Sequence, residues 1–269
     1  IHLQLAKVNI KEVLRALETF APLPLQEGFD NAGLQIGLTG EQDVTGALLC
    51  LDVTLDVVDE AIRNGFNLIV SHHPLLFHGL KRISNDGSSI ERIVIKAIQN
   101  NIAIVSMHTN LDNAVGGVNY EMAQKLGLTD VGFLQPFTRA GLEGGSGVVG
   151  LLPEAMTDSE FVDSGKTVFN TPAAMVSQSC GRSVRKVALC GGAGSFLLGE
   201  AKAKGADVFI TGEMHYHEYF EALGDIQIVV LGHYETEQYT SELLQEILAK
   251  SCPGLKTKIA QSTNPIYIV

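Results

Sequence analysis

Short apolar runs rich in β-branched residues alternate along the first half of the chain with longer segments whose apolar residues recur at helical spacing. The pattern predicts strands at 46–53, at 66–73 and from 102, and helices at 55–65, 88–101 and 119–128. Strand–helix–strand alternation is typical of an α/β fold with a largely parallel sheet.

The second half repeats this pattern. A shift of 140 residues aligns Val44 with Val184, Cys50 with Cys190 and Gly65 with Gly205. A generic likeness between two βαβ units is one explanation, and duplication is the other. We predict two similar α/β/α halves related by internal duplication, covering residues 1–130 and 131–269, with the C-terminal strand free to return to the first half.

Two glycine-rich stretches invite comparison with phosphate-binding loops. The stretch at 138–154 lacks the lysine of a P-loop and is interpreted as a turn-rich link between the halves. The stretch "CGGAGS" at 190–195 lies between a predicted strand and a predicted helix. It is either an anion site at a helix start or a tight turn that needs small residues.

Composition narrows the class of protein. A formal net charge of −11 and the absence of tryptophan argue against nucleic-acid binding. No run of eighteen apolar residues occurs, so no membrane span is expected. The first residues, which include His2, are interpreted as a strand or arm before a helix and not as a signal peptide, and no functional role is expected for His2. The four cysteines are scattered without CxxC spacing, which is typical of a protein of the reducing cytoplasm.

Histidines and carboxylates follow four of the predicted strands. Because ligands of open α/β sheets bind beyond the carboxyl ends of the strands, these side chains are candidates for one site. The candidates are His72, His73, His108, Asp112, Glu213, His215, His233 and Glu237.

Neutral imidazole and carboxylate suit zinc, iron, manganese, cobalt or nickel. His72 and His73 are adjacent, so on a straight strand they point to opposite faces, but Pro74 favours a turn there. His233 and Glu237 are four residues apart and share one face of a helix. His78 is interpreted as a surface residue, and His108 either binds metal or supports a ligand by hydrogen bonding.

Several motifs together resemble one known family. They are "FDNAGLQIG" (29–37), "SHHPLLFHGLKRI" (71–83), "HTNLDNAVGGVN" (108–119), "CGGAGS" (190–195), "TGEMHYHE" (211–218) and "GHYETE" (232–237). The chain resembles the YbgI-like dinuclear-metal family, also called GTP cyclohydrolase I type 2 homologues. Many members have aspartate where this chain has Glu213, which leaves the role of that carboxylate open.

The resemblance implies a site for two divalent metal ions in a crevice between the halves. Their ligands would be His72, His73, Asp112, His233 and Glu237, with Glu237 as the bridge. It also implies a ring-shaped homohexamer without the extra domain of longer members.

Two functions fit this site. A metal-dependent hydrolase would act on a nucleotide or another anionic small molecule, with Glu213, His108 or His215 as a proton shuttle. The alternative is a non-catalytic metal-binding scaffold or regulatory interaction protein.

Overall fold

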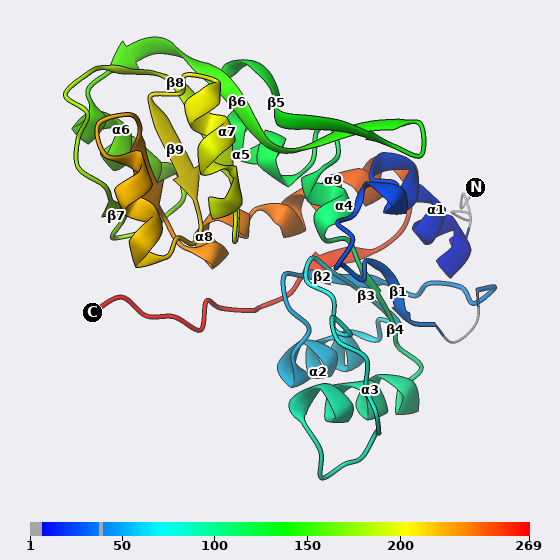
Figure 1. Ribbon diagram of the computed structural model, residues 1–269. Helices are drawn as coiled ribbons and strands as arrows, with labels where there is room; N and C mark the ends of the chain where they lie inside the picture. Colours follow the sequence, from blue (N-terminus) through cyan, green and yellow to red (C-terminus); the bar gives the residue numbers. More distant parts are fainter. Residues whose placement is uncertain (1–6, 38–39) are drawn as a thin grey trace. The chain divides into compact units, whose positions relative to one another are not determined.

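The computed structural model describes residues 7–37 and 40–269, so the predicted N-terminal arm and His2 lie outside the described residues (Figure 1). The chain divides into two compact units. Unit 1 comprises Ile1–Leu111 and Thr240–Thr263, and unit 2 comprises Asp112–Tyr239 and Asn264–Val269. The sequence analysis had placed the first boundary at 130/131. The chain leaves unit 1 earlier than that, and residues 240–263 return to it.

Unit 1 contains a five-stranded sheet in the order β1-β4-β3-β2-β11. Its strands are β1 (Gly33–Ile36), β2 (Ala47–Cys50), β3 (Leu68–Ser71), β4 (Ala103–Ser106) and β11 (Thr257–Ile259). Strand β1 is antiparallel to β4, and the other neighbours are parallel. The crossovers pass through α2 (Leu55–Asn64), which ends at the left-handed Gly65, and α3 (Ser89–Gln99), which starts with a Ser88–Glu91 capping box.

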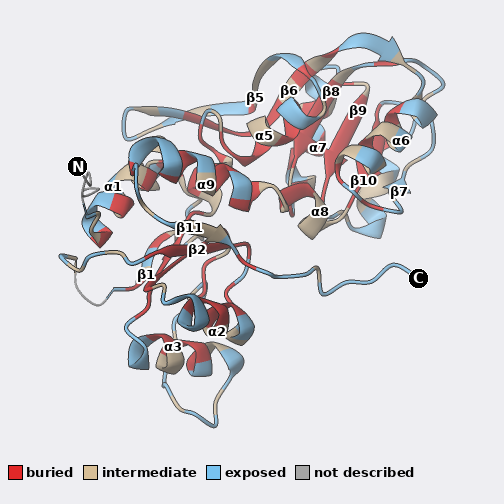
Figure 2. Cartoon of the chain, turned by 180° about the vertical axis from the view of Figure 1, so that it is seen from behind, coloured by how far each residue is buried: buried red, intermediate tan, exposed pale blue. Residues whose placement is uncertain are grey.

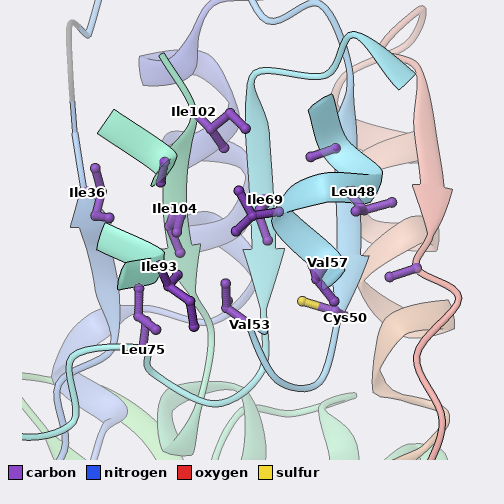
Figure 3. Close-up of a cluster of buried hydrophobic side chains, with 14 of the residues drawn as sticks. Ile36, Leu48, Cys50, Val53, Val57, Ile69, Leu75, Ile93, Ile102 and Ile104 are labelled. Carbon is purple, nitrogen blue, oxygen red and sulfur yellow. The ribbon is translucent and has the colours of Figure 1, made fainter. Parts of the chain in front are cut away.

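Helices cover both faces of this sheet. Alternate strand residues Leu48, Cys50, Ile69 and Ile104 pack against α2 and α3, as Figure 3 shows for Val57 and Ile93. Helices α1 (Ile10–Phe20) and α9 (Thr240–Ser251) contact each other, and α9 also contacts β2 and β11. Strands buried on both faces explain the continuous apolar runs of the sequence.

Unit 2 contains a six-stranded sheet in the order β5-β6-β8-β9-β10-β7. Its strands are β5 (Thr129–Arg139), β6 (Leu142–Met156), β7 (Met175–Val176), β8 (Val184–Cys190), β9 (Val208–Thr211) and β10 (Gln227–Val230). Its helices are α5 (Val118–Lys125), α6 (Asp158–Val168), α7 (Leu198–Ala203) and α8 (His233–Glu237), with α4 (Thr109–Asp112) at the boundary of the units. Short 3₁₀ turns are η1 (Leu23–Leu25), η2 (Ser195–Leu197) and η3 (Tyr216–Ala222).

This sheet also has two apolar faces. Residues of α5 and α6 join one core cluster, and residues of α7 and η3 join the other. Strands β8 and β9 are red, and therefore buried, in Figure 2, whereas the helices keep pale exposed surfaces. Each unit is thus an α/β/α arrangement by itself.

The glycine-rich stretch at 138–154 is not a link. It forms the end of β5 and most of β6, which pair antiparallel through a turn at Ala140 and Gly141. Both turn residues have positive φ, 50° and 76°, as a two-residue hairpin of this twist requires. Gly145 lies under the ring of Phe133, where an added Cβ would approach ring atoms to 2.5 Å. The glycines therefore provide packing space within a hairpin.

The predicted α/β fold is confirmed, and the predicted elements are present with ends shifted by a few residues. Strands β2 and β8, and β3 and β9, occur at the offset used to align the halves. Duplication itself stays a prediction. Within the described residues, no helix is both long and apolar enough to cross a membrane.

Candidate metal centre

A backbone turn after β3 brings His72 and His73 to the same side. Ser71 Oγ donates to the carbonyl oxygen of His73 at 2.9 Å and lies 2.8 Å from Ser106 Oγ at the end of β4. These two buried serines hold the peptide at His73. The histidine rings therefore do not take opposite faces, and their centroids lie 4.8 Å apart.

The Nδ1 atoms of both rings contact oxygen acceptors. His72 Nδ1 lies 2.8 Å from the carbonyl oxygen of Met107, and His73 Nδ1 lies 3.0 Å from Asp52 Oδ1. A carbonyl oxygen can only accept a hydrogen bond, so His72 Nδ1 carries the proton. In the neutral ring this leaves the lone pair on Nε2, which is the tautomer that binds metal.

His108 has the same arrangement. Its Nδ1 lies 2.8 Å from Asp30 Oδ1, and its backbone N–H donates to Asn110 Oδ1 at 3.0 Å. The Asp30 side chain is fully buried and also accepts from the backbone N–H and the hydroxyl of Thr109. Burial raises the pKa of Asp30, but the hydrogen bonds from His108 and Thr109 outweigh it and lower the pKa to about 2.

His72, His73 and His108 form a group that can hold a metal ion. One ring nitrogen of each lies within 4.8 Å of the others. His72 is buried, whereas His73 and His108 are partly accessible. Unit 1 by itself therefore presents three imidazoles at the carboxyl ends of β3 and β4.

Unit 2 contributes a histidine between two carboxylates. His233 begins α8, directly after Gly232, and Glu237 is one turn later with a nearly buried side chain. His233 Nδ1 lies 2.7 Å from Glu213 Oε1, and His233 Nε2 lies 3.1 Å from Glu237 Oε2. The second separation matches the roughly 3.0–3.4 Å between two ligands of one ion at bond lengths of about 2.1 Å.

The glycine loop 190–195 packs against this carboxylate. A Cβ on Gly192 would lie 2.3 Å from Glu237 Oε1 and 3.1 Å from His233 Nε2. The N–H groups of Gly191, Gly192 and Gly194 donate to the side chains of Asn119, Thr236 and Thr211. These three donors are occupied within the protein, which favours the interpretation of the loop as a tight turn that makes room for Glu237.

The remaining predicted residues are placed as follows. Asp112 ends α4, one turn after His108, and is half-buried. His215 is exposed at the start of η3, and its proposed role stays a prediction. His78 is exposed and belongs to neither group of candidate metal ligands found among the described residues. Glu213 contacts His233, which gives this carboxylate an orienting role.

Two carboxylates and one glycine contact the candidate ligands although the sequence pattern did not single them out. Asp52 follows β2, and its position after a strand was the same signal that identified the histidines. Asp30 is within the motif at 29–37, but its partner is 78 residues away. Gly192 was noted only for its loop, because the contact with Glu237 arises in the folded chain.

The fold and these side chains define a class: an α/β protein whose histidine and carboxylate clusters suit divalent metal ions. The family model of Duf34/NIF3 (NGG1p interacting factor 3) matches residues 8–265. The chain therefore belongs to the Duf34/NIF3 family, which includes the proteins named GTP cyclohydrolase 1 type 2 homologues, and the resemblance inferred from its motifs is confirmed.

Individual relatives agree with this assignment. A GTP cyclohydrolase 1 type 2 homolog of Clostridium acetobutylicum is 34% identical over 265 residues, covering 96% of this chain and 97% of the relative. The crystal structure of a Bacillus cereus protein related to NIF3 is 28% identical with a TM-score of 0.88, covering 98% of this chain and 100% of that one. A hypothetical protein of Staphylococcus aureus is 27% identical with a TM-score of 0.88, covering the same shares of the two chains.

Proposed function

We propose that the chain is a metal-dependent hydrolase that uses two divalent ions to act on a nucleotide or another anionic small molecule. The proposed ligands are His72, His73, Asp112, His233 and Glu237, with Glu237 bridging the ions. Support comes from the ligand types, from family membership and from the contacts that fix each imidazole.

The contacts of His233 carry the proposal. A neutral imidazole donates from one nitrogen only, and a carboxylate only accepts. With Nδ1 facing Glu213 at 2.7 Å and Nε2 facing Glu237 at 3.1 Å, the ring meets an acceptor on both sides. A cation shared by Nε2 and Glu237 resolves this arrangement, since both atoms then act as electron-pair donors. Double protonation of the ring is the competing resolution, and metal titration separates the two.

Bound divalent ions lower the pKa of water towards neutrality and stabilise the negative charge that develops in hydrolysis. The residues of the chain prepare this chemistry. Asp52 and Glu213 orient His73 and His233 through Nδ1, and the Met107 carbonyl does the same for His72. Asp112 and Glu237 together contribute a charge of −2 against +4 from two ions, so the site attracts an anionic substrate despite the acidic protein.

A turnover assay with matched variants tests the hydrolase. Protein supplied with zinc or manganese is incubated with GTP and with p-nitrophenyl phosphate, and product release is followed for the native chain, His72→Ala, Glu237→Ala and His78→Ala. The proposal expects metal-dependent turnover that falls at least about a hundredfold in the first two variants. His78→Ala should retain full metal content. Metal binding without turnover of any substrate would favour the non-catalytic scaffold.

The proposal also covers the oligomeric state and the cellular location of the protein. We propose a homohexamer and a cytoplasmic location, on the basis of family resemblance and of four cysteines that are scattered without CxxC spacing. Sedimentation velocity tests the assembly, because a hexamer has six times the 28.8 kDa of one chain. A monomer at micromolar concentration would contradict it.

A further inference from the structure

Two phenylalanine rings are exposed beside the histidines of unit 1. Phe29 exposes 69% of its surface and Phe77 exposes 38%. The two rings pack edge to face with centroids 6.3 Å apart. Leaving large rings in water is unfavourable by about 25 cal/mol per Å² of apolar surface, so a pair that stays exposed next to polar chemistry suggests a bound partner.

The backbone that carries both rings is fixed by side chains. Asn31 Nδ2 donates to the carbonyl oxygen of Leu76 at 2.7 Å, and Gln35 Oε1 accepts from the Leu76 N–H at 3.1 Å. Asp30, next to Phe29, is held by His108 and Thr109. The two loops are therefore joined directly beside the rings. Such preorganisation lowers the entropic cost of binding a ligand.

The rings adjoin the candidate metal ligands. The Phe77 ring centroid lies 6.2 Å from that of His108, which in turn lies 5.3 Å from His72 and 5.5 Å from His73. A planar group stacked on Phe77 would therefore lie beside His108, whose ring adjoins those of His72 and His73.

We propose that Phe29 and Phe77 form a stacking platform for the planar heteroaromatic ring of a phosphorylated small molecule, such as a nucleotide. The size of the platform favours this occupant. Covering the exposed parts of these two rings buries only about 150–270 Å², whereas a stable protein interface needs about 800 Å² from each partner. The inference rests on the proposed metal-dependent function, because it names the substrate class of that same site. It also assigns a purpose to Phe29 in the motif at 29–37, whose Asp30 contacts His108.

Calorimetric titration tests the platform with probes that share a phosphate. Guanosine 5′-monophosphate and adenosine 5′-monophosphate carry a ring, and ribose 5-phosphate does not. We expect the native protein to bind both nucleotides at least about ten times more tightly than ribose 5-phosphate. Phe29→Leu and Phe77→Leu should each weaken nucleotide binding about five- to one-hundredfold, while ribose 5-phosphate binds as before. Phe77→Tyr should retain nucleotide binding, and Ile83→Ala, which changes another exposed apolar residue of unit 1, is the matched control.

Nucleotides that bind no more tightly than ribose 5-phosphate would overturn the platform. So would leucine variants that bind them like the native protein, or leucine variants that change only the mass of the assembly in sedimentation. The titrations are run with and without zinc, and metal content is measured on the same samples. If nucleotides bind more tightly than ribose 5-phosphate but the protein holds no metal, the proposed function alone is rejected. If the protein holds metal but binds nucleotides and ribose 5-phosphate equally, the platform alone is rejected.

Discussion

At the scale of single residues, the main feature is that each candidate imidazole ligand has a fixed orientation within its own unit. Three of the four rings contact a carboxylate through Nδ1, and the fourth contacts a backbone carbonyl. Such contacts select the tautomer and raise the basicity of the ligand nitrogen. We therefore predict that the carboxylates that contact Nδ1 affect metal affinity through the imidazoles they orient.

Replacing Glu213 tests this directly. Glu213→Ala removes the acceptor of His233 Nδ1, so metal affinity should fall about 10- to 100-fold. Glu213→Gln keeps an oxygen acceptor and should lose less. Competition titration against a chelating dye measures the affinity, with Glu221→Ala as the control for an exposed carboxylate of the same unit. Equal affinity in Glu213→Ala and the native chain would show that the contact has no orienting effect.

Asp30 should govern stability in acid. Because its pKa falls from 3.8 to about 2 on folding, the carboxylate stabilises the fold above pH ~4, and this contribution is lost as the pH falls towards ~2. Asp30→Asn should cost about 2 kcal/mol at neutral pH and should flatten the loss of stability between these pH values. Urea unfolding at several pH values measures this. Asp163→Asn, at an exposed surface pair, should leave the profile unchanged. If the free energy of unfolding of Asp30→Asn falls with pH in parallel with that of the native chain, Asp30 does not govern stability in acid.

The sequence revealed those residues whose signal is local. His72, His73 and His233 stand out because each directly follows an apolar strand. Glu237 is identified by its spacing from His233 on one helix face. The roles of Asp52 and Asp30 are visible only in the folded chain. Asp52 contacts the imidazole of His73, 21 residues away, and Asp30 contacts that of His108, 78 residues away.

At the scale of elements, the loop between β8 and η2 limits where Glu237 can lie. Gly192 has φ 60°, and three N–H groups of the loop donate to buried or partly buried side chains. These hydrogen bonds hold the loop in place. The Glu237 carboxylate occupies the space that a side chain at position 192 would need. Glycine is needed here both for its backbone conformation and for the space it leaves.

Gly192→Ala should therefore reduce metal binding more than it reduces folding. The added Cβ would meet Glu237 Oε1 at 2.3 Å, so the carboxylate must move away from His233. We expect metal affinity to fall at least about tenfold, with a loss of stability of about 1–2 kcal/mol from the left-handed backbone. The control is Gly199→Ala in α7, where a Cβ meets open space and helix propensity should add up to about 1 kcal/mol of stability. If Gly192→Ala binds metal with the affinity of the native chain, the close approach of Gly192 to the Glu237 carboxylate has no effect on metal binding.

Elements with a clear period were predictable, and the hairpin of β5 and β6 was not. Gly144, Gly145 and Gly147 interrupt the alternation that identifies a strand. Their purpose becomes visible only in the folded pairing, where Gly145 lies under Phe133 and the chain turns at Ala140–Gly141. Side-chain packing across strands is a tertiary property and leaves little trace in a local sequence window.

At the scale of the molecule, the chain forms two α/β/α units, and residues 240–263 belong to the first of them although they follow the second in sequence. The repeat predicted halves at 1–130 and 131–269 with the C-terminal strand free to return to the first half. The return is stabilised by β11 pairing with β2 and by α9 packing on α1. The two units are therefore linked by more than one chain crossing.

We propose that the chain holds two divalent ions through His72, His73, Asp112, His233 and Glu237. The most direct measurement is metal content by mass spectrometry on protein purified without added metal, for the native chain, Glu237→Ala and His78→Ala. We predict about two ions per chain for the native protein and for His78→Ala, and about one or none for Glu237→Ala. A native protein without bound metal, or a Glu237→Ala variant with unchanged metal content, would contradict the account.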